Sequence, residues 1–369
     1  MNFVIDNRKR FAVYNNTTDG DIHRLVKQTR KLGYSLSEDI ITREVNMDKA
    51  KVLVLARMEP ILREILWEKA PDVFELTELG IEASEQEIVE ILIDSDFLIP
   101  LRIRIPDRAL REARKLKLIQ LFSQGYDRIQ MDLIKELGIP VANIGGFNAI
   151  SVAEHTVMLI LALLRRLIPS ISAIKEGRFA FDLDRRLYHQ LYEKTVGIIG
   201  MGNIGKRIAA IVNAFGGKIV FYDPASVSPV FLDQCNAQPM ELNKLLKCSD
   251  IVTLHVPLLE GTRGLINRDR LLMMKPSAVL INTSRGPVVD ETALIRVLEE
   301  KQIAGAGLDV FMEEPLKPDS PLLFMDNVVT TPHIGGFSIE NVYLRVDFMW
   351  QNIGRVWRNG TPENVVAGQ

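Results

Sequence analysis

Short apolar runs alternate with amphipathic, helix-patterned segments along most of the chain. This alternation predicts parallel strands with helices on both faces of a sheet. The first group of predicted strands is 51–56, 73–76, 97–100, 118–122 and 140–143. A second group is 195–199, 218–223, 251–256, 278–282, 304–309 and 327–331. We therefore expect two doubly wound α/β sheets, the second with six strands.

Three other segments indicate how the two predicted sheets are connected. Residues 151–167 form a predicted helix with apolar side chains around much of its circumference, which is typical of a helix buried between domains or deep in a core. Polar residues 175–194 resemble a linker that leads into the second sheet. A final helix is predicted over 339–358, after the last strand of the second sheet, and we expect it to return to the first domain.

A three-glycine turn follows the first strand of the second group. Gly200, Gly202 and Gly205 stand between an apolar run and an amphipathic helix, and Asp223 ends the next strand, 18 residues after Gly205. In a dinucleotide cradle the first glycine allows the tight turn, the second lets a pyrophosphate approach the backbone, and the third lets helix and strand pack closely. An acid at Asp223 accepts hydrogen bonds from a ribose diol and repels a 2′-phosphate, which favours NAD over NADP. The alternative is a purely structural turn.

Length and composition narrow the classes of function. A chain of 369 residues exceeds one ordinary core, so two domains are expected. The net charge of −2 comes from interspersed signs and offers no basic face for nucleic acid or anionic membranes. The N-terminus lacks a signal-peptide pattern, and the longest apolar run, 157–164, is shorter than a membrane span, so we expect a soluble, cytoplasmic protein.

Metal and disulfide chemistry are not expected. The two cysteines, Cys235 and Cys248, exclude a disulfide framework and a zinc ribbon, and we expect reduced, mostly buried thiols. Five histidines are present without a His-Glu-x-x-His helix, so no protein-ligated metal is predicted.

Three side chains with useful chemistry follow the predicted strands of the second sheet. These are Arg285, Glu314 and His333. Hydride transfer between a hydroxy acid and NAD needs such a set: an imidazole to take the hydroxyl proton, a carboxylate to orient it, and a guanidinium to hold the substrate carboxylate. Taken singly, Arg285 could be an ion-pair arginine, Glu314 a solvated acid and His333 a helix-capping group.

The ordered motifs resemble the D-isomer-specific 2-hydroxyacid dehydrogenases over about 51–366. The matching segments are Asn148-Ala-Ile-Ser-Val-Ala-Glu-His155, the glycine turn, His255-Val-Pro-Leu258 with Thr262, Ile281-Asn-Thr-Ser-Arg-Gly-Pro-Val-Val-Asp290, Gly307-Leu-Asp-Val310 and Thr331-Pro-His-Ile-Gly-Gly336. The family implies that Arg285 binds substrate, that His333 is the acid/base, and that Glu314, five residues after Asp309, pairs with it. A carboxylate at Glu314 disfavours formate dehydrogenase, where an amide stands.

The resemblance also implies a domain plan and a cofactor site. We expect an extra N-terminal element (1–50), a split flavodoxin-like substrate domain (51–147 and 335–369), an inserted Rossmann NAD domain (148–334), and a homodimer built on the helix beginning near Ser151. The predicted NAD-binding residues are Gly200, Gly202, Asn203, Ile204, Gly205, Asp223, His255, Val256, Pro257, Thr262, Thr283, Ser284, Arg285, Asp309, His333, Gly335 and Gly336.

Residues that choose the substrate are less typical of the family. In relatives a glycine-rich loop holds the substrate carboxylate, which here implies Gln124 and Gly125, although small residues are usual where Gln124 stands. Asn148 is a further expected substrate contact. Arg102 and Arg104 resemble a segment that phosphoglycerate dehydrogenases place near the distal anion; the alternative is a pair of surface arginines.

These observations predict an NAD-dependent oxidoreductase acting on a D-2-hydroxy acid or 2-oxoacid. A nucleotide-sensing protein like the corepressors of the same family is an alternative, although a sensor needs none of Arg285, Glu314 and His333. A dehydrogenase of another oxyanion, such as phosphite or formate, is a third.

Overall fold

The computed structural model describes residues 4–5, 11–12, 49–101 and 103–367. Most of the predicted N-terminal element and Arg102 lie outside these residues. Val4–Ile5 (β1) and Phe11–Ala12 (β2) pair antiparallel. The remainder divides into two compact units: the described residues up to Asn143 together with those from Val346 onward, and Ile144–Arg345. The second unit therefore begins before Asn148 and continues past Gly335 into the final helix.

The first unit is built on a six-stranded sheet in the order β15-β7-β6-β5-β3-β4. Its strands are β3 (Ala50–Ala56), β4 (Phe74–Leu79), β5 (Phe97–Leu101), β6 (Leu118–Gln120), β7 (Val141–Ala142) and β15 (Val365–Ala367). Its helices are α3 (Pro60–Glu68), α4 (Glu85–Leu92), α5 (Asp107–Glu112), α6 (Met131–Leu137) and part of α14 (Ile339–Trp357). All neighbours pair in parallel except β15, which runs antiparallel to β7. The pattern missed β15 because three residues are too few to show a period.

The C-terminal half of α14 packs on the first unit through buried polar contacts. The indole N–H of Trp350 donates to the carbonyl of Leu66 at 3.1 Å. The fully buried Asn352 amide donates to Gln120 Oε1 at 2.7 Å and accepts the Glu363 N–H at 2.7 Å. These bonds join α14 and the segment before β15 to the centre of the sheet.

The second unit holds a seven-stranded, all-parallel sheet in the order β10-β9-β8-β11-β12-β13-β14. Its strands are β8 (Thr195–Ile199), β9 (Lys218–Tyr222), β10 (Ala237–Pro239), β11 (Ile251–Leu254), β12 (Val279–Asn282), β13 (Gly305–Leu308) and β14 (Val328–Thr330). Its helices include α7 (Ala149–Leu164), α8 (Leu167–Lys175), α9 (Asn203–Ala214), α10 (Pro229–Cys235), α11 (Leu242–Cys248), α12 (Arg268–Leu271) and α13 (Glu291–Glu299).

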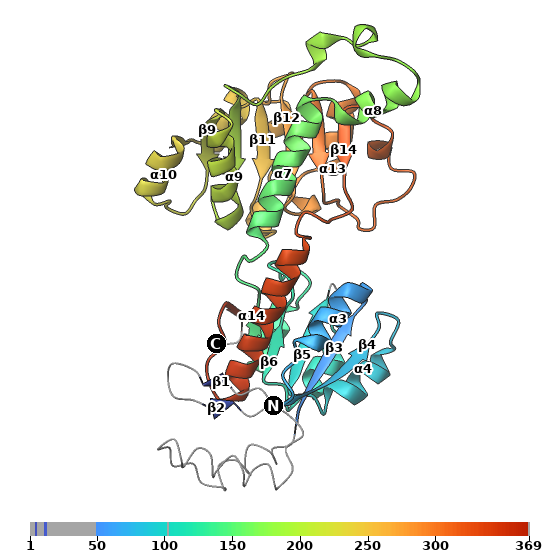
Figure 1. The fold of residues 1–369 in the computed structure, drawn as a ribbon, viewed down its shortest axis with the longest axis vertical. Coiled ribbons are helices and arrows are strands. Elements are labelled where there is room, and N and C mark those ends of the chain that lie inside the picture. Colours follow the sequence, from blue (N-terminus) through green and yellow to red (C-terminus); the bar gives the residue numbers. More distant parts are fainter. Residues whose placement is uncertain (1–3, 6–10, 13–48, 102, 368–369) are drawn as a thin grey trace. The chain divides into compact units, whose positions relative to one another are not determined.

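The predicted fold class, two parallel α/β sheets, is confirmed (Figure 1). The expectation of six strands in the second sheet is wrong, because β10 adds a short edge strand that ends in a proline and buries only Ala237. Such a strand has no readable alternation. The strand order reverses beside β8, which places a crevice for ligands outside the carboxyl ends of β8 and β11.

Helix α7 lies against β12, β13 and β14 (Figure 1), and β13 contains the two glycines Gly305 and Gly307. A Cβ at Gly307 would lie 3.2 Å from Leu159 Cβ, so the glycine lets helix and sheet approach closely. The predicted helix through Leu167 is interrupted, because Arg166 adopts the left-handed conformation (φ 47°) between α7 and α8. Among the described residues no single helix is long and apolar enough to cross a membrane; α7 and α8 together pass by length and composition but bend by 56°.

The polar stretch 175–194, which the sequence indicates as a linker leading into the second sheet, connects α8 to β8. It lies wholly within the second unit and contains the 3₁₀ turns Ala180–Asp182 and Arg185–Leu187. Near its end Leu191 is buried in the same core cluster as Val196. The stretch is therefore a connection within the second unit, between α8 and β8.

Candidate active site

Arg285, Glu314 and His333 follow three neighbouring strands of the second sheet. Arg285 comes after β12, Glu314 after β13 and His333 after β14. The register places Asn282 beside Leu308 and Leu308 beside Thr330, so the three strands end at the same level. Their loops leave one edge of the sheet side by side.

The structure brings His333 and Glu314 into direct contact. His333 Nδ1 lies 2.8 Å from Glu314 Oε2, and Glu314 Oε1 accepts the Phe311 N–H at 3.3 Å. Both side chains are partly exposed, at 32% and 24%. An ionised carboxylate only accepts hydrogen bonds, so Nδ1 carries a proton and donates it. The neighbouring acid Glu313 instead forms an exposed ion pair with Lys317 at 2.9 Å.

The turn that carries Arg285 is closed by a buried asparagine. Asn282 donates from Nδ2 to the carbonyl of Arg285 at 2.9 Å, and its Oδ1 accepts from the N–H and hydroxyl of Ser284 at 3.1 and 2.8 Å. A Cβ on Gly286 would lie 1.9 Å from the carbonyl carbon of Phe311, so only glycine lets the loop after β13 pass. Sequence reasoning included Asn282 in a motif but missed this organising role.

The glycine turn has the backbone geometry that an anion needs. Gly200 adopts φ 99°, and a Cβ there would lie 2.7 Å from the carbonyl oxygen of His255. A Cβ on Gly205 would lie 2.1 Å from the carbonyl oxygen of Gly200. Around Gly202 nothing lies within 4 Å of the Cβ position, and α9 begins at the next residue. A pyrophosphate therefore finds open space beside an exposed backbone at a helix N-terminus.

Asp223 is held next to this turn. Its Oδ2 accepts the N–H of Met201, which lies in the turn, at 2.7 Å, and its Oδ1 accepts the Ala225 N–H at 2.8 Å. Each carboxylate oxygen can accept a second hydrogen bond. The arrangement therefore fits a ribose diol, and the turn and Asp223 together fit a dinucleotide.

Other predicted cofactor residues gather at the ends of β11 and β12. His255, Val256 and Pro257 follow β11, and the Thr262 hydroxyl donates to the Pro257 carbonyl at 2.6 Å. Burial lowers the pKa of His255 to about 3, so its ring is neutral. The hydroxyls of the buried Thr283 and Thr156 lie 2.9 Å apart, which ties the loop after β12 to α7.

Asp309 holds the loop after β14. Its buried carboxylate accepts hydrogen bonds from the Thr331 hydroxyl at 2.6 Å and from the N–H groups of Ile334 and Gly335 at 2.9 and 2.8 Å. These three donors flank His333, which adopts the left-handed conformation (φ 56°). A contact of Asp309 with the nicotinamide stays a prediction.

The predicted substrate residues lie in both units. In the first unit the carbonyl of Gln124 accepts from Asn143 Nδ2 at 2.8 Å, and that of Gly125 accepts from Ser123 Oγ at 2.7 Å. Arg104 is mostly exposed and lies 3.2 Å from Asp107. In the second unit Asn148 immediately precedes α7, and its Nδ2 would lie 3.4 Å from a Cβ on Gly336.

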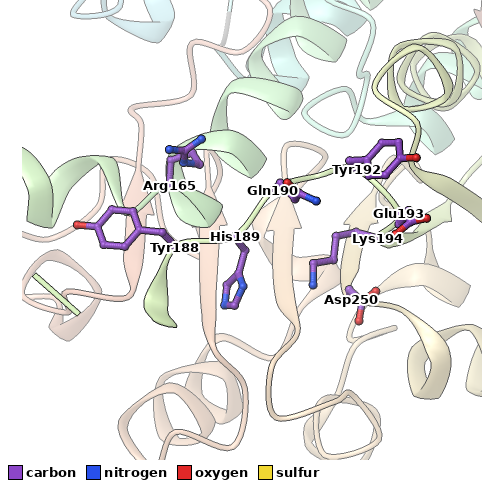
Figure 2. Close-up of a pocket in the computed structure, with 8 residues that line it drawn as sticks. All are labelled: Arg165, Tyr188, His189, Gln190, Tyr192, Glu193, Lys194 and Asp250. Atoms are coloured by element: carbon purple, nitrogen blue, oxygen red, sulfur yellow. The ribbon is translucent and has the colours of Figure 1, made fainter. Parts of the chain in front are cut away.

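A polar hollow of about 520 Å³ lies at the opposite edge of the second sheet (Figure 2). It includes Lys194 and Asp250, which directly precede β8 and β11, whereas Arg285 and His333 follow their strands. This hollow is therefore separate from the catalytic candidates. Within the described part of the chain, no group of three or more His, Cys, Asp or Glu side chains could hold a metal ion.

Comparisons with known proteins show the family of this chain. The model of the D-isomer specific 2-hydroxyacid dehydrogenase NAD binding domain matches residues 157–335. A glyoxylate reductase of Korarchaeum cryptofilum is 37% identical over 286 residues, covering 77% of this chain and 86% of that protein. The chain belongs to the D-isomer specific 2-hydroxyacid dehydrogenase family. It is an NAD-dependent oxidoreductase, so the enzyme class and cofactor predicted from the sequence are confirmed.

Two further family members are also similar to this chain. D-3-phosphoglycerate dehydrogenase of Methanocaldococcus jannaschii is 36% identical, but the chain spans only 55% of its length. The structure of Aquifex aeolicus D-lactate dehydrogenase, complexed with NAD and lactic acid, is 30% identical and superposes with a TM-score of 0.75 over 86% of this chain and 99% of that one.

The open space beside Gly202 generates a test of the cofactor site. Replacing Gly202 with alanine adds a methyl group that meets no protein atom within 4 Å, so the melting temperature should stay within about 2 °C of the wild type. The methyl group would occupy the space of the pyrophosphate, so the Kd for NADH should rise about tenfold or more, equivalent to about 1.4 kcal/mol. Fluorescence titration measures the Kd.

The matched control is Gly354→Ala on α14, where the three atoms nearest to a Cβ belong to the flexible Arg358 side chain, at 3.4 Å or more. It should leave the Kd for NADH unchanged. If Gly202→Ala and the wild type bound NADH with equal affinity, the glycine turn would not be part of the cofactor site.

Proposed function

We propose that the protein interconverts a small 2-oxoacid and the corresponding D-2-hydroxy acid, with His333 as acid/base, Glu314 as its partner and Arg285 as the ligand of the substrate carboxylate. The observation that carries this proposal is the 2.8 Å contact of His333 with Glu314 beyond the carboxyl end of the NAD-domain sheet. A sensor of NAD needs no such pair, and a formate dehydrogenase has no hydroxyl proton to remove.

The residues divide the work of the reduction. NADH, when bound, supplies the hydride. His333 donates the proton on Nε2 to the carbonyl oxygen, because Nδ1 is committed to Glu314. Glu314 stays anionic throughout, fixes the plane of the ring and stabilises the imidazolium before the transfer. Arg285, whose Nη1 donates to the Ser284 carbonyl at 2.7 Å, pairs with the substrate carboxylate and so orients the carbonyl carbon for attack.

The relatives support a small substrate. Two glyoxylate reductases are 37% and 38% identical to the chain, and a hydroxypyruvate reductase is 32% identical. The exposed position of Arg104 beside Asp107 supports a surface role for this arginine rather than recognition of a second anion. We therefore assign glyoxylate, hydroxypyruvate or pyruvate as the substrate class.

A substrate panel with NADH and NADPH side by side tests this proposal. We expect NADH oxidation at 340 nm with at least one of the three 2-oxoacids, and a kcat/KM for NADPH lower by about tenfold or more, because the Asp223 carboxylate repels a 2′-phosphate. His333→Gln should lower kcat by about 10²–10⁴-fold and Glu314→Gln by about 10²-fold, with the Kd for NADH unchanged.

Three results would contradict parts of this account. Absence of turnover with the whole panel would favour a nucleotide sensor. Turnover of phosphite or formate alone would mean that the enzyme acts on another class of substrate. Full activity in His333→Gln would show that His333 is not the acid/base. It would not affect the assignment of the cofactor site.

We also propose that the protein is a homodimer, and we extend the interface expected on α7, the helix that contains Ser151, to include α8. On this helix Leu167, Ile168, Ile171 and Ile174 are 44–58% exposed, an apolar face typical of association surfaces. Sedimentation equilibrium at micromolar concentration should give twice the mass of the chain, and Ile171→Glu combined with Ile174→Glu should give the monomer mass. A monomeric wild-type protein would contradict the proposal.

A further inference from the structure

His155 on α7 has no part in the chemistry proposed above, yet it lies beneath the loop that carries His333. The loop after β14 is irregular, and His333 within it adopts the left-handed conformation, which non-glycine residues rarely adopt. Within the loop the His333 N–H donates to the nearby Thr331 carbonyl at 3.0 Å. Something outside the loop must hold this conformation.

Thr331 is the point at which His155 meets the loop. His155 Nε2 lies 2.9 Å from Thr331 Oγ1 and 3.4 Å from Asp309 Oδ1. The Thr331 hydroxyl has one hydrogen, and at 2.6 Å it donates that hydrogen to Asp309, because a carboxylate can only accept. The Thr331 oxygen must therefore accept from His155, so Nε2 carries the hydrogen. The chain of hydrogen bonds has one direction, from His155 through Thr331 to Asp309.

Packing reinforces this chain. The His155 side chain is 12% exposed and that of Asp309 is 3% exposed, so few water molecules compete for these bonds. A Cβ on Gly335 would lie 2.9 Å from Asp309 Oδ2 and 3.3 Å from His155 Cδ2. The backbone after His333 thus rests directly on both side chains. Burial acts to raise the pKa of Asp309, but hydrogen bonds from His155, Thr331, Gly335 and Ile334 outweigh it and hold the pKa below its usual range.

We propose that His155 is a positioning residue for His333: by donating to Thr331 it fixes the hydroxyl that Asp309 binds, and so holds the acid/base loop in its active conformation. The inference rests on the proposed function for its kinetic effect, whereas the conformational effect is independent of it. His155 touches neither the predicted substrate nor the reacting atoms, so its removal should lower kcat rather than abolish binding.

Two substitutions separate the effect of the His155 hydrogen bond from the effect of the size of its ring. His155→Leu keeps an apolar side chain of similar size and removes the donor, whereas His155→Gln keeps an N–H donor at the reach of Nε2. We expect His155→Leu to lower kcat about 10- to 100-fold, as a misplaced catalytic group does, with KM and the NADH Kd within about threefold of wild type. His155→Gln should restore kcat to within about threefold of wild type.

The matched control is His189→Leu, an exposed imidazole in the hollow at the opposite edge of the same unit (Figure 2). It should leave kcat unchanged. A wild-type kcat in His155→Leu would overturn the proposal, as would equal loss in His155→Leu and His155→Gln, which indicates general damage to the fold. Lack of turnover in the wild type would instead count against the proposed function.

Hydrogen–deuterium exchange tests the conformational claim without any turnover. The amides of Ile334 and Gly335 donate to Asp309, so a peptide covering 331–337 should exchange faster in His155→Leu than in wild type or His155→Gln. Peptides from β8 and β9 should exchange at wild-type rates. Unchanged exchange of 331–337 in His155→Leu would overturn the proposal whether or not the protein turns over 2-oxoacids.

Discussion

The buried carboxylate of Asp309 is the interaction on which the catalytic arrangement depends. A charge in this position is stable only because hydrogen-bond donors surround it, and three of its donors come from the loop that carries His333. The charge therefore orders the loop while the loop solvates the charge. This reciprocity explains how His333 keeps a left-handed backbone conformation and still meets Glu314 at 2.8 Å.

Close backbone approach is the second constraint. Gly200, Gly205 and Gly286 each stand where a Cβ would meet another backbone atom at less than 3 Å. Gly202 has the opposite surroundings, with open space where the cofactor fits. The parallel sheet brings these features to one edge, because all seven strands of the second unit end there. The parallel sheet thus places the ends of its strands at the same level, and the glycines leave space for the cofactor and the catalytic side chains.

Local patterns in the sequence predicted the strands, the glycine turn and the side chains that follow the strands. They missed β10 and β15, which are too short to show a period. Sequence reasoning also missed the roles of Asn282 and His155. The partners of His155 stand more than 150 residues away along the chain, so only the folded sheet shows that they meet.

The most direct test follows the hydride itself. The protein is incubated with hydroxypyruvate and with NADH that carries deuterium at both C4 positions of the nicotinamide, and the product is analysed by mass spectrometry and chiral chromatography. The account predicts D-glycerate that carries one deuterium at C2, because the cofactor delivers the hydride while His333 supplies the proton from solvent. Glycerate without deuterium at C2, or the L-enantiomer, would contradict it.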